Sequence, residues 1–147
     1  MWWQDLLRNR VLSAVAVAWF IAQTSKPLLF RITKGRWDWR WLFSAGGMPS
    51  SHSAAVAALA TAVALREGLH TAAFAIAIVL AVVVMYDSAG VRRASSLQAR
   101  ILNQILEELF SGRPIAHTKL IELVGHTPFE VIVGGALGTG IVLWMAR

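Results

Sequence analysis

Long apolar segments alternate with short polar ones along this chain of 147 residues. Residues 8–30, 53–65 and 71–86 are mainly apolar, and a last apolar segment begins near Thr127 and runs to Met145. A helix needs about 17 to 25 apolar residues to cross a bilayer, so the shorter segments are at the limit and their ends are set only to within a few residues. The pattern predicts an all-α integral membrane protein with about four transmembrane helices.

Two further segments predict structure at the membrane surface. From Leu97 to Phe110, apolar residues recur three or four positions apart and polar residues fill the rest, which is typical of an amphipathic helix too polar to cross the membrane. Between Arg31 and Phe43, basic residues are interleaved with tryptophans, a composition that favours the lipid headgroup layer. We find no internal repeat or second domain, so the chain predicts one membrane-embedded domain over residues 1–147.

Composition strengthens the membrane interpretation and narrows the partners. Hydrophobic residues make up 56% of the chain, which exceeds the level of about 45–50% in soluble proteins. The net charge is +6, but the basic residues lie between apolar segments, so anionic lipid or phosphate is a better partner than nucleic acid. The chain has no cysteine, which excludes disulfides, thiolate metal ligands and cysteine nucleophiles.

The most unusual polar stretch is Gly-Gly-Met-Pro-Ser-Ser-His-Ser-Ala at residues 46–54. Its glycines and proline interrupt the chain just before an Ala-rich apolar segment, so Ser50, Ser51 and His52 fall in the first turn of the predicted helix. The N–H groups and positive dipole end of a first turn attract anions, and a histidine there can move a proton. Serines are also ordinary helix caps, and the stretch alone supports both interpretations equally.

An up-and-down bundle brings the other unusual polar residues to the same side of the membrane. These residues lie at the ends of predicted helices that meet on that side: Lys26, His52, Asp87, Arg93, His126 and Glu130. The connections on that side carry nine basic residues and the opposite side carries four. By the positive-inside rule, the side with the polar residues is expected to face the cytoplasm.

The converging residues resemble a known superfamily. Pro49-Ser50-Ser51-His52 resembles the Pro-Ser-Gly-His motif of the type 2 phosphatidic acid phosphatase and vanadium-dependent haloperoxidase superfamily. His126-x-x-x-Glu130 resembles its closing His-x-x-x-Asp motif. Residues 46–54, 87–93 and 125–130 together resemble the small divergent branch of that superfamily.

The resemblance implies phosphoryl transfer without a metal or other cofactor. It implies that His126 is the nucleophile, that Glu130 orients it and that His52 is the general acid. It also implies that Lys26, Ser50 and Ser51 bind phosphate. The chemistry is reasonable on physical grounds, because fixed cations and N–H donors stabilise a phosphoryl group in transfer, and two histidines can serve as nucleophile and acid.

Four departures from the superfamily pattern stand out. Ser51 replaces the usual glycine, Glu130 replaces the usual aspartate, the Arg-Pro of the first motif is missing, and Leu120 stands six residues before the closing histidine in place of arginine. The missing arginines leave the phosphate site short of positive charge. Arg92 and Arg93 are our candidates to replace them, although they also fit an ordinary basic flank after a membrane helix.

Two carboxylates have alternative roles. Thr127-Pro128-Phe129-Glu130 fits a capping box, in which Glu130 reaches back to the helix start and does not orient His126. The sequence leaves both roles open. We expect Asp87 to support the site by binding Arg92 or Lys26 rather than to take part in the chemistry.

Three classes of function fit these features. The first is a membrane phosphatase that hydrolyses a lipid phosphate or diphosphate, with membrane lipids as its surroundings and no nucleic-acid partner. The second is a non-catalytic lipid-phosphate binding or transport protein that retains the pocket. The third, a phosphatase or haloperoxidase for soluble substrates, fits a small membrane-embedded chain less well. We expect a bacterial-type plasma membrane as the location, and the sequence is compatible with a homo-oligomer.

Overall fold

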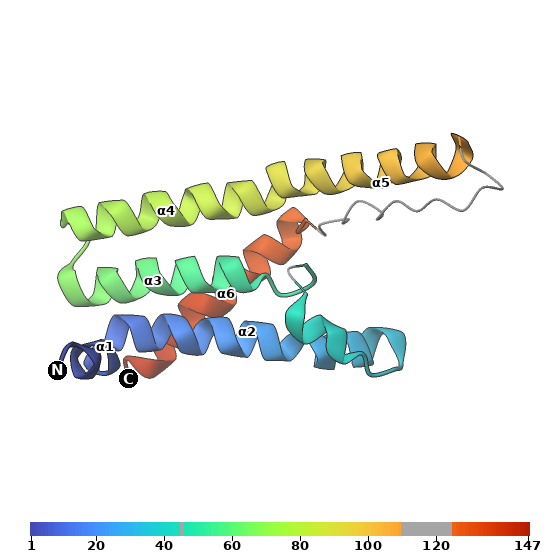
Figure 1. Cartoon of the computed structure of the whole chain (residues 1–147). Coiled ribbons are helices and arrows are strands. Elements are labelled where there is room, and N and C mark those ends of the chain that lie inside the picture. The colour runs from blue at the N-terminus through green and yellow to red at the C-terminus, as the bar shows by residue number, and fades with distance from the viewer. Residues whose placement is uncertain (45, 110–124) are drawn as a thin grey trace.

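The structure, a computed structural model, describes residues 1–44, 46–109 and 125–147, and helices account for most of them (Figure 1). In chain order the elements are α1 (Trp2–Arg8), α2 (Arg10–Lys34), the 3-10 helix η1 (Trp39–Phe43), α3 (Ser51–Glu67), α4 (Ala72–Ala89), α5 (Val91–Leu109) and α6 (Pro128–Met145). The two termini lie close together at one end of the bundle, and the turn between α3 and α4 lies at the same end (Figure 1).

Within the described part of the chain, three helices are long and apolar enough to cross a membrane, namely α2, α4 and α6. The fourth predicted segment corresponds to α3, which has 17 residues and packs against all three of them. Large apolar side chains on the outer surface of α4, including Ile76, Val79 and Val83, are exposed, as expected of a surface that faces lipid. The prediction of an all-helical membrane protein with about four spanning segments is confirmed.

Small residues allow the central helices to approach closely. One core cluster combines Ala14 and Ala18 of α2 with Ala58 and Ala62 of α3 and with the end of α6. Glycine in α6 contributes to this close contact, because a Cβ atom added at Gly138 would lie 2.8 Å from the carbonyl carbon of Ala54. In lipid such close packing contributes more to helix association than the hydrophobic effect does.

Two predicted boundaries are wrong at the N-terminal end. The sequence predicts one helix over residues 8–30, but the chain breaks at Asn9 and the second piece continues to Lys34. Asn9 starts a new helix because its side chain accepts hydrogen bonds from the N–H groups of Val11 and Leu12, at 3.0 and 3.2 Å. Gly35 ends that helix at a φ of 75°, which glycine adopts without strain.

The amphipathic helix starts earlier than the sequence predicts. It begins at Val91 in place of Leu97 and reaches Leu109, so that it follows α4 after a break at Gly90 (Figure 1). Its apolar residues include Leu97, Ile101 and Ile105, which remain exposed. Leu120, which stands in the place of a motif arginine, lies outside the described residues.

Candidate active site

His126 is a buried histidine fixed from two directions. It directly precedes Thr127, the N-cap of α6, and only 2% of it is exposed. Its backbone N–H donates to the carbonyl of Ser88 at 3.1 Å, which ties it to the end of α4. Its ring Nδ1 lies 3.2 Å from Oε2 of Glu130, one helical turn further along the chain. Because a carboxylate only accepts hydrogen bonds, Nδ1 carries the hydrogen of a neutral ring and Nε2 keeps its lone pair.

Glu130 contacts both His126 and the start of α6, so the structure has the contact that each of its two suggested roles needs. The oxygen that contacts His126 also accepts a hydrogen bond from the N–H of Thr127 at 3.0 Å. The hydroxyl of Thr127 accepts in turn from the N–H of Glu130 at 3.3 Å, which completes the capping box. The cap therefore holds the carboxylate in the position from which it contacts the histidine.

The first turn of α3 is joined to the first turn of α6. Ser50 is the N-cap of α3 and is fully buried, and its N–H donates to the carbonyl of Glu130 at 3.2 Å. Its hydroxyl accepts from the N–H of Ser53 at 3.3 Å and from the Ser53 hydroxyl at 2.9 Å. A Cβ atom at Gly134 would lie 3.1 Å from Cβ of Ser50, so only a glycine leaves enough room there. The prediction that the serines begin this helix is confirmed.

His52 lies in the same first turn, and its ring faces that of His126. The two ring centroids are 6.4 Å apart and the ring planes meet at 61°. Ser51, beside it in the chain, is 2% exposed. Two imidazoles at this separation can act on opposite sides of one small group, one as nucleophile and the other as proton donor.

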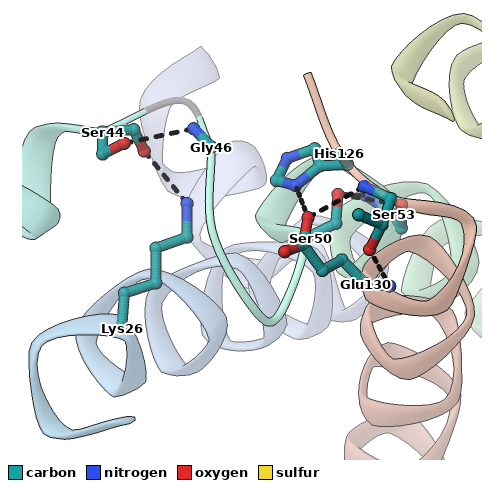
Figure 2. Close-up of polar contacts among 8 residues, drawn as sticks. Lys26, Ser44, Gly46, Ser50, Ser53, His126 and Glu130 are labelled. Atoms are coloured by element: carbon teal, nitrogen blue, oxygen red, sulfur yellow. Dashed lines mark hydrogen bonds and ion pairs between the residues drawn. The ribbon is translucent and has the colours of Figure 1, made fainter. Parts of the chain in front are cut away.

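Lys26 holds the loop that leads into α3. It is buried, and its Nζ donates to the carbonyl of Ser44 at 3.0 Å. Gln23, one turn earlier on α2, donates to the carbonyls of Leu42 and Ser44 at 2.7 and 3.1 Å. Figure 2 shows Lys26 on one side of this loop and His126 on the other. Positive charge thus lies next to the loop, although the ammonium already donates a hydrogen bond to the carbonyl of Ser44.

The other predicted site residues, Asp87, Arg92 and Arg93, lie around the junction of α4 and α5. Asp87 is in the last turn of α4, half-buried, and directly precedes Ser88. Arg92 and Arg93 belong to the first turn of α5, and their side chains lie outside what the structure describes. Among the described residues, no group of three histidine, aspartate or glutamate side chains is placed to hold a metal ion.

Sequence reasoning missed three serines that build the site. Ser88 supplies the carbonyl for His126, Ser53 supplies a hydroxyl for Ser50, and Ser44 accepts from Lys26. Ser53 stands at the third position after the cap, where such a contact is common. Ser44 and Ser88 act through backbone carbonyls, which any residue provides, so that their side chains give no sequence signal.

Comparison with known proteins places this arrangement in a family. Over 97% of each chain, with 153 aligned positions, the protein is 38% identical to the uncharacterized membrane protein YuiD of Bacillus subtilis (strain 168). No solved structure matches it. Residues 7–141 match the sequence model of the Divergent PAP2 family, a range that includes His52, His126 and the start of α6 that carries Glu130. The chain therefore belongs to the Divergent PAP2 family.

Proposed function

We propose that this protein is a membrane phosphatase that hydrolyses a lipid phosphate or diphosphate through a phosphohistidine at His126. The observation that carries the proposal is the buried ring of His126, with Nδ1 held 3.2 Å from Glu130 and the ring of His52 at a centroid distance of 6.4 Å. Family membership supports a phosphatase-like membrane protein.

The proposed reaction has two steps. In the first, Nε2 of His126 attacks phosphorus, the bond from phosphorus to the lipid oxygen breaks, and His52 gives its proton to that oxygen. In the second, water attacks the phosphohistidine, its proton passes to His52, and inorganic phosphate leaves from Nε2. Glu130 stabilises the positive charge that the ring of His126 acquires when it becomes phosphorylated.

Charge on the phosphoryl oxygens needs fixed positive groups. We assign this role to the first turn of α3, with Ser50 and Ser51, and to Lys26, whose ammonium lies beside the loop that leads into α3. Arg92 and Arg93 complete the proposed phosphate site from the start of α5. Asp87, in the last turn of α4, is proposed to orient one of these arginines.

The substrate class follows from the membrane setting. The histidine pair lies where α3 and α6 begin, close to the end of a membrane-spanning helix. A lipid phosphate in the same leaflet presents its headgroup at the depth of the histidine pair. A soluble substrate has no contact with the membrane that would favour a site at this depth. We propose that this leaflet is the cytoplasmic one, because basic residues are more numerous on this side.

The face of the membrane can be tested by chemical labelling. The chain lacks cysteine, so single cysteines at Arg36 and His70, both exposed and at opposite ends of the bundle, have no background. An impermeant thiol reagent on intact cells is expected to label His70→Cys and to spare Arg36→Cys. The reverse pattern would place the proposed site outside the cytoplasm.

Phosphate release from purified protein tests the activity itself. Phosphatidic acid, phosphatidylglycerophosphate and a polyprenyl diphosphate are presented in detergent micelles with a metal chelator, and inorganic phosphate is measured. We expect release from at least one of them and inhibition by vanadate, which adopts the five-coordinate geometry of phosphoryl transfer. Saturable binding of a lipid phosphate without release from any would favour a non-catalytic binding or transport protein.

A further inference from the structure

A second polar feature lies at the other end of the bundle, next to the two termini. A cavity of about 740 Å³ opens there between the ends of α1, α3 and α6 and the start of α2. Three arginines line it: Arg8 at the end of α1, Arg10 at the start of α2 and Arg66 in the last turn of α3. We call it the arginine cavity.

Positive charge dominates the arginine cavity. Among the described residues, no acidic side chain lines it. Glu67 lies just outside, with Oε1 at 3.5 Å from Nε of Arg66, but both side chains are about half exposed. Such a pair at the surface is weak and leaves the arginine available to another anion. Three guanidinium groups around one space form a site for phosphate, because each offers a planar fork of N–H donors.

Helix dipoles do not account for all three arginines. Arg8 and Arg66 stand in the last turns of their helices, where a cation is favourable without any ligand. Arg10 is the first residue of α2, where the positive end of the dipole disfavours a cation. A bound anion would remove this unfavourable placement, because the helix start and the arginine would then face the same negative charge.

Apart from Ser13, the remaining lining of the arginine cavity is apolar. Val11, Ala62 and Val142 continue the cavity from the arginines toward the middle of the bundle. Because α2 and α6 are long enough to cross a membrane, their ends lie near the depth of lipid headgroups. A phosphate group with an attached hydrocarbon chain matches this sequence of polar and apolar lining, whereas free phosphate matches only the arginines.

We propose that the arginine cavity binds an anionic phospholipid, with its phosphate against Arg8, Arg10 and Arg66 and part of an acyl chain along the apolar lining. The site is separate from the histidine pair and lies on the opposite side of the membrane. It holds a structural or regulatory lipid, and the binding does not depend on the proposed hydrolysis.

Native mass spectrometry of the delipidated full-length protein can count bound lipids. Phosphatidylglycerol is the probe and phosphatidylcholine the reference of no net charge; because phosphatidylglycerol is a phosphodiester, its binding is separate from the phosphomonoester hydrolysis proposed above. We expect one phosphatidylglycerol to bind at least about tenfold more tightly than phosphatidylcholine. The triple variant R8Q/R10Q/R66Q is expected to lose this preference.

A matched variant controls for net charge. R31Q/R36Q/R40Q removes the same three charges from exposed positions at the other end of the bundle and is expected to keep the preference. R8K/R10K/R66K keeps charge without the planar fork, and we expect intermediate affinity from a protein that folds. Equal binding by the wild type and R8Q/R10Q/R66Q, or equal loss in both glutamine variants, would overturn the proposal.

Competition separates the two sources of phosphate. Millimolar inorganic phosphate is expected to leave the bound phosphatidylglycerol in place, because it lacks the apolar contacts. Displacement at that concentration, with the same loss in R8Q/R10Q/R66Q, would mean that the cavity takes free phosphate and would overturn its assignment to a lipid.

Discussion

The two ends of the bundle carry their polar side chains in opposite ways. Around His126, polar groups are buried and held by the backbone: Lys26 donates to a carbonyl and Glu130 accepts from an N–H. Around the arginine cavity, Arg8, Arg10 and Arg66 are exposed on long flexible side chains. Fixed groups favour chemistry, because they need no reorganisation during a reaction, whereas flexible ones favour reversible binding.

We expect enzymatic activity to depend on the end of the bundle that holds His126 and not on the arginine cavity. Within that end, the nucleophile is expected to matter most. His126→Ala is expected to abolish turnover of every substrate and to prevent a phosphoenzyme, because no other group takes up the phosphoryl group. Acid-labile label from a phosphorus-32 substrate measures the intermediate. As a control, His70→Ala removes an exposed histidine at the opposite end of the bundle. This variant is expected to keep both turnover and the phosphoenzyme. Wild-type turnover by His126→Ala would refute the proposed mechanism.

His52 should matter according to the leaving group. In the first step His52 supplies only a proton, so His52→Ala is expected to lower kcat/KM for a lipid phosphate by about 100- to 10,000-fold and to have little effect on kcat/KM for an aryl phosphate, whose leaving group needs no proton. The ratio of kcat/KM for the two substrates measures this. An equal loss on both would assign His52 to binding or structure.

Glu130 separates orientation from capping. In Glu130→Gln the amide oxygen still accepts from Thr127 N–H, so the capping box and Tm are expected to persist. The negative charge beside His126 is lost, and we expect activity to fall by about 100-fold or more. Thermal unfolding in detergent and kcat are measured on one preparation. An unchanged kcat would leave Glu130 with the cap as its sole role.

Parts of this molecule follow directly from local sequence patterns. The Thr-Pro-Phe-Glu cap of α6 is where the sequence predicts it, and the small residues between α3 and α6 stand in the sequence as alanines and glycines. Such features depend on neighbours along the chain or on residue size, and both can be read without a structure. The closeness of His52 and His126 follows from the bundle topology together with the resemblance.

Other parts depend on contacts that leave no local signal. The break at Asn9 falls between two arginines, where a continuous helix is equally plausible until the cap is seen. The loop before α3 is set by Lys26 and Gln23 through backbone carbonyls. The arginine cavity combines residues near position 10 with Arg66, and only the packing of α2 on α3 brings them together.

The smallest predicted effect concerns the contact between α3 and α6, the two helices that carry His52 and Glu130. A Cβ atom at Gly138 meets the backbone of Ala54, which cannot move without shifting α3, whereas at Gly140 no described atom lies within 4 Å. Gly138→Ala is therefore expected to lower stability by about 1–3 kcal/mol, and Gly140→Ala to leave it unchanged or slightly raised, because alanine favours a helix. Tm in detergent measures both.

Gly134 adds a link from this contact to the proposed chemistry. Its missing Cβ leaves room for Ser50, so Gly134→Ala is expected to move the first turn of α3, with His52, away from His126. We therefore expect Gly134→Ala to lose more kcat than Gly138→Ala at a similar loss of Tm, because a small displacement of a catalytic group is costly. If the two variants lost kcat in proportion to Tm, close packing of α3 on α6 would stabilise the bundle without positioning the histidine pair.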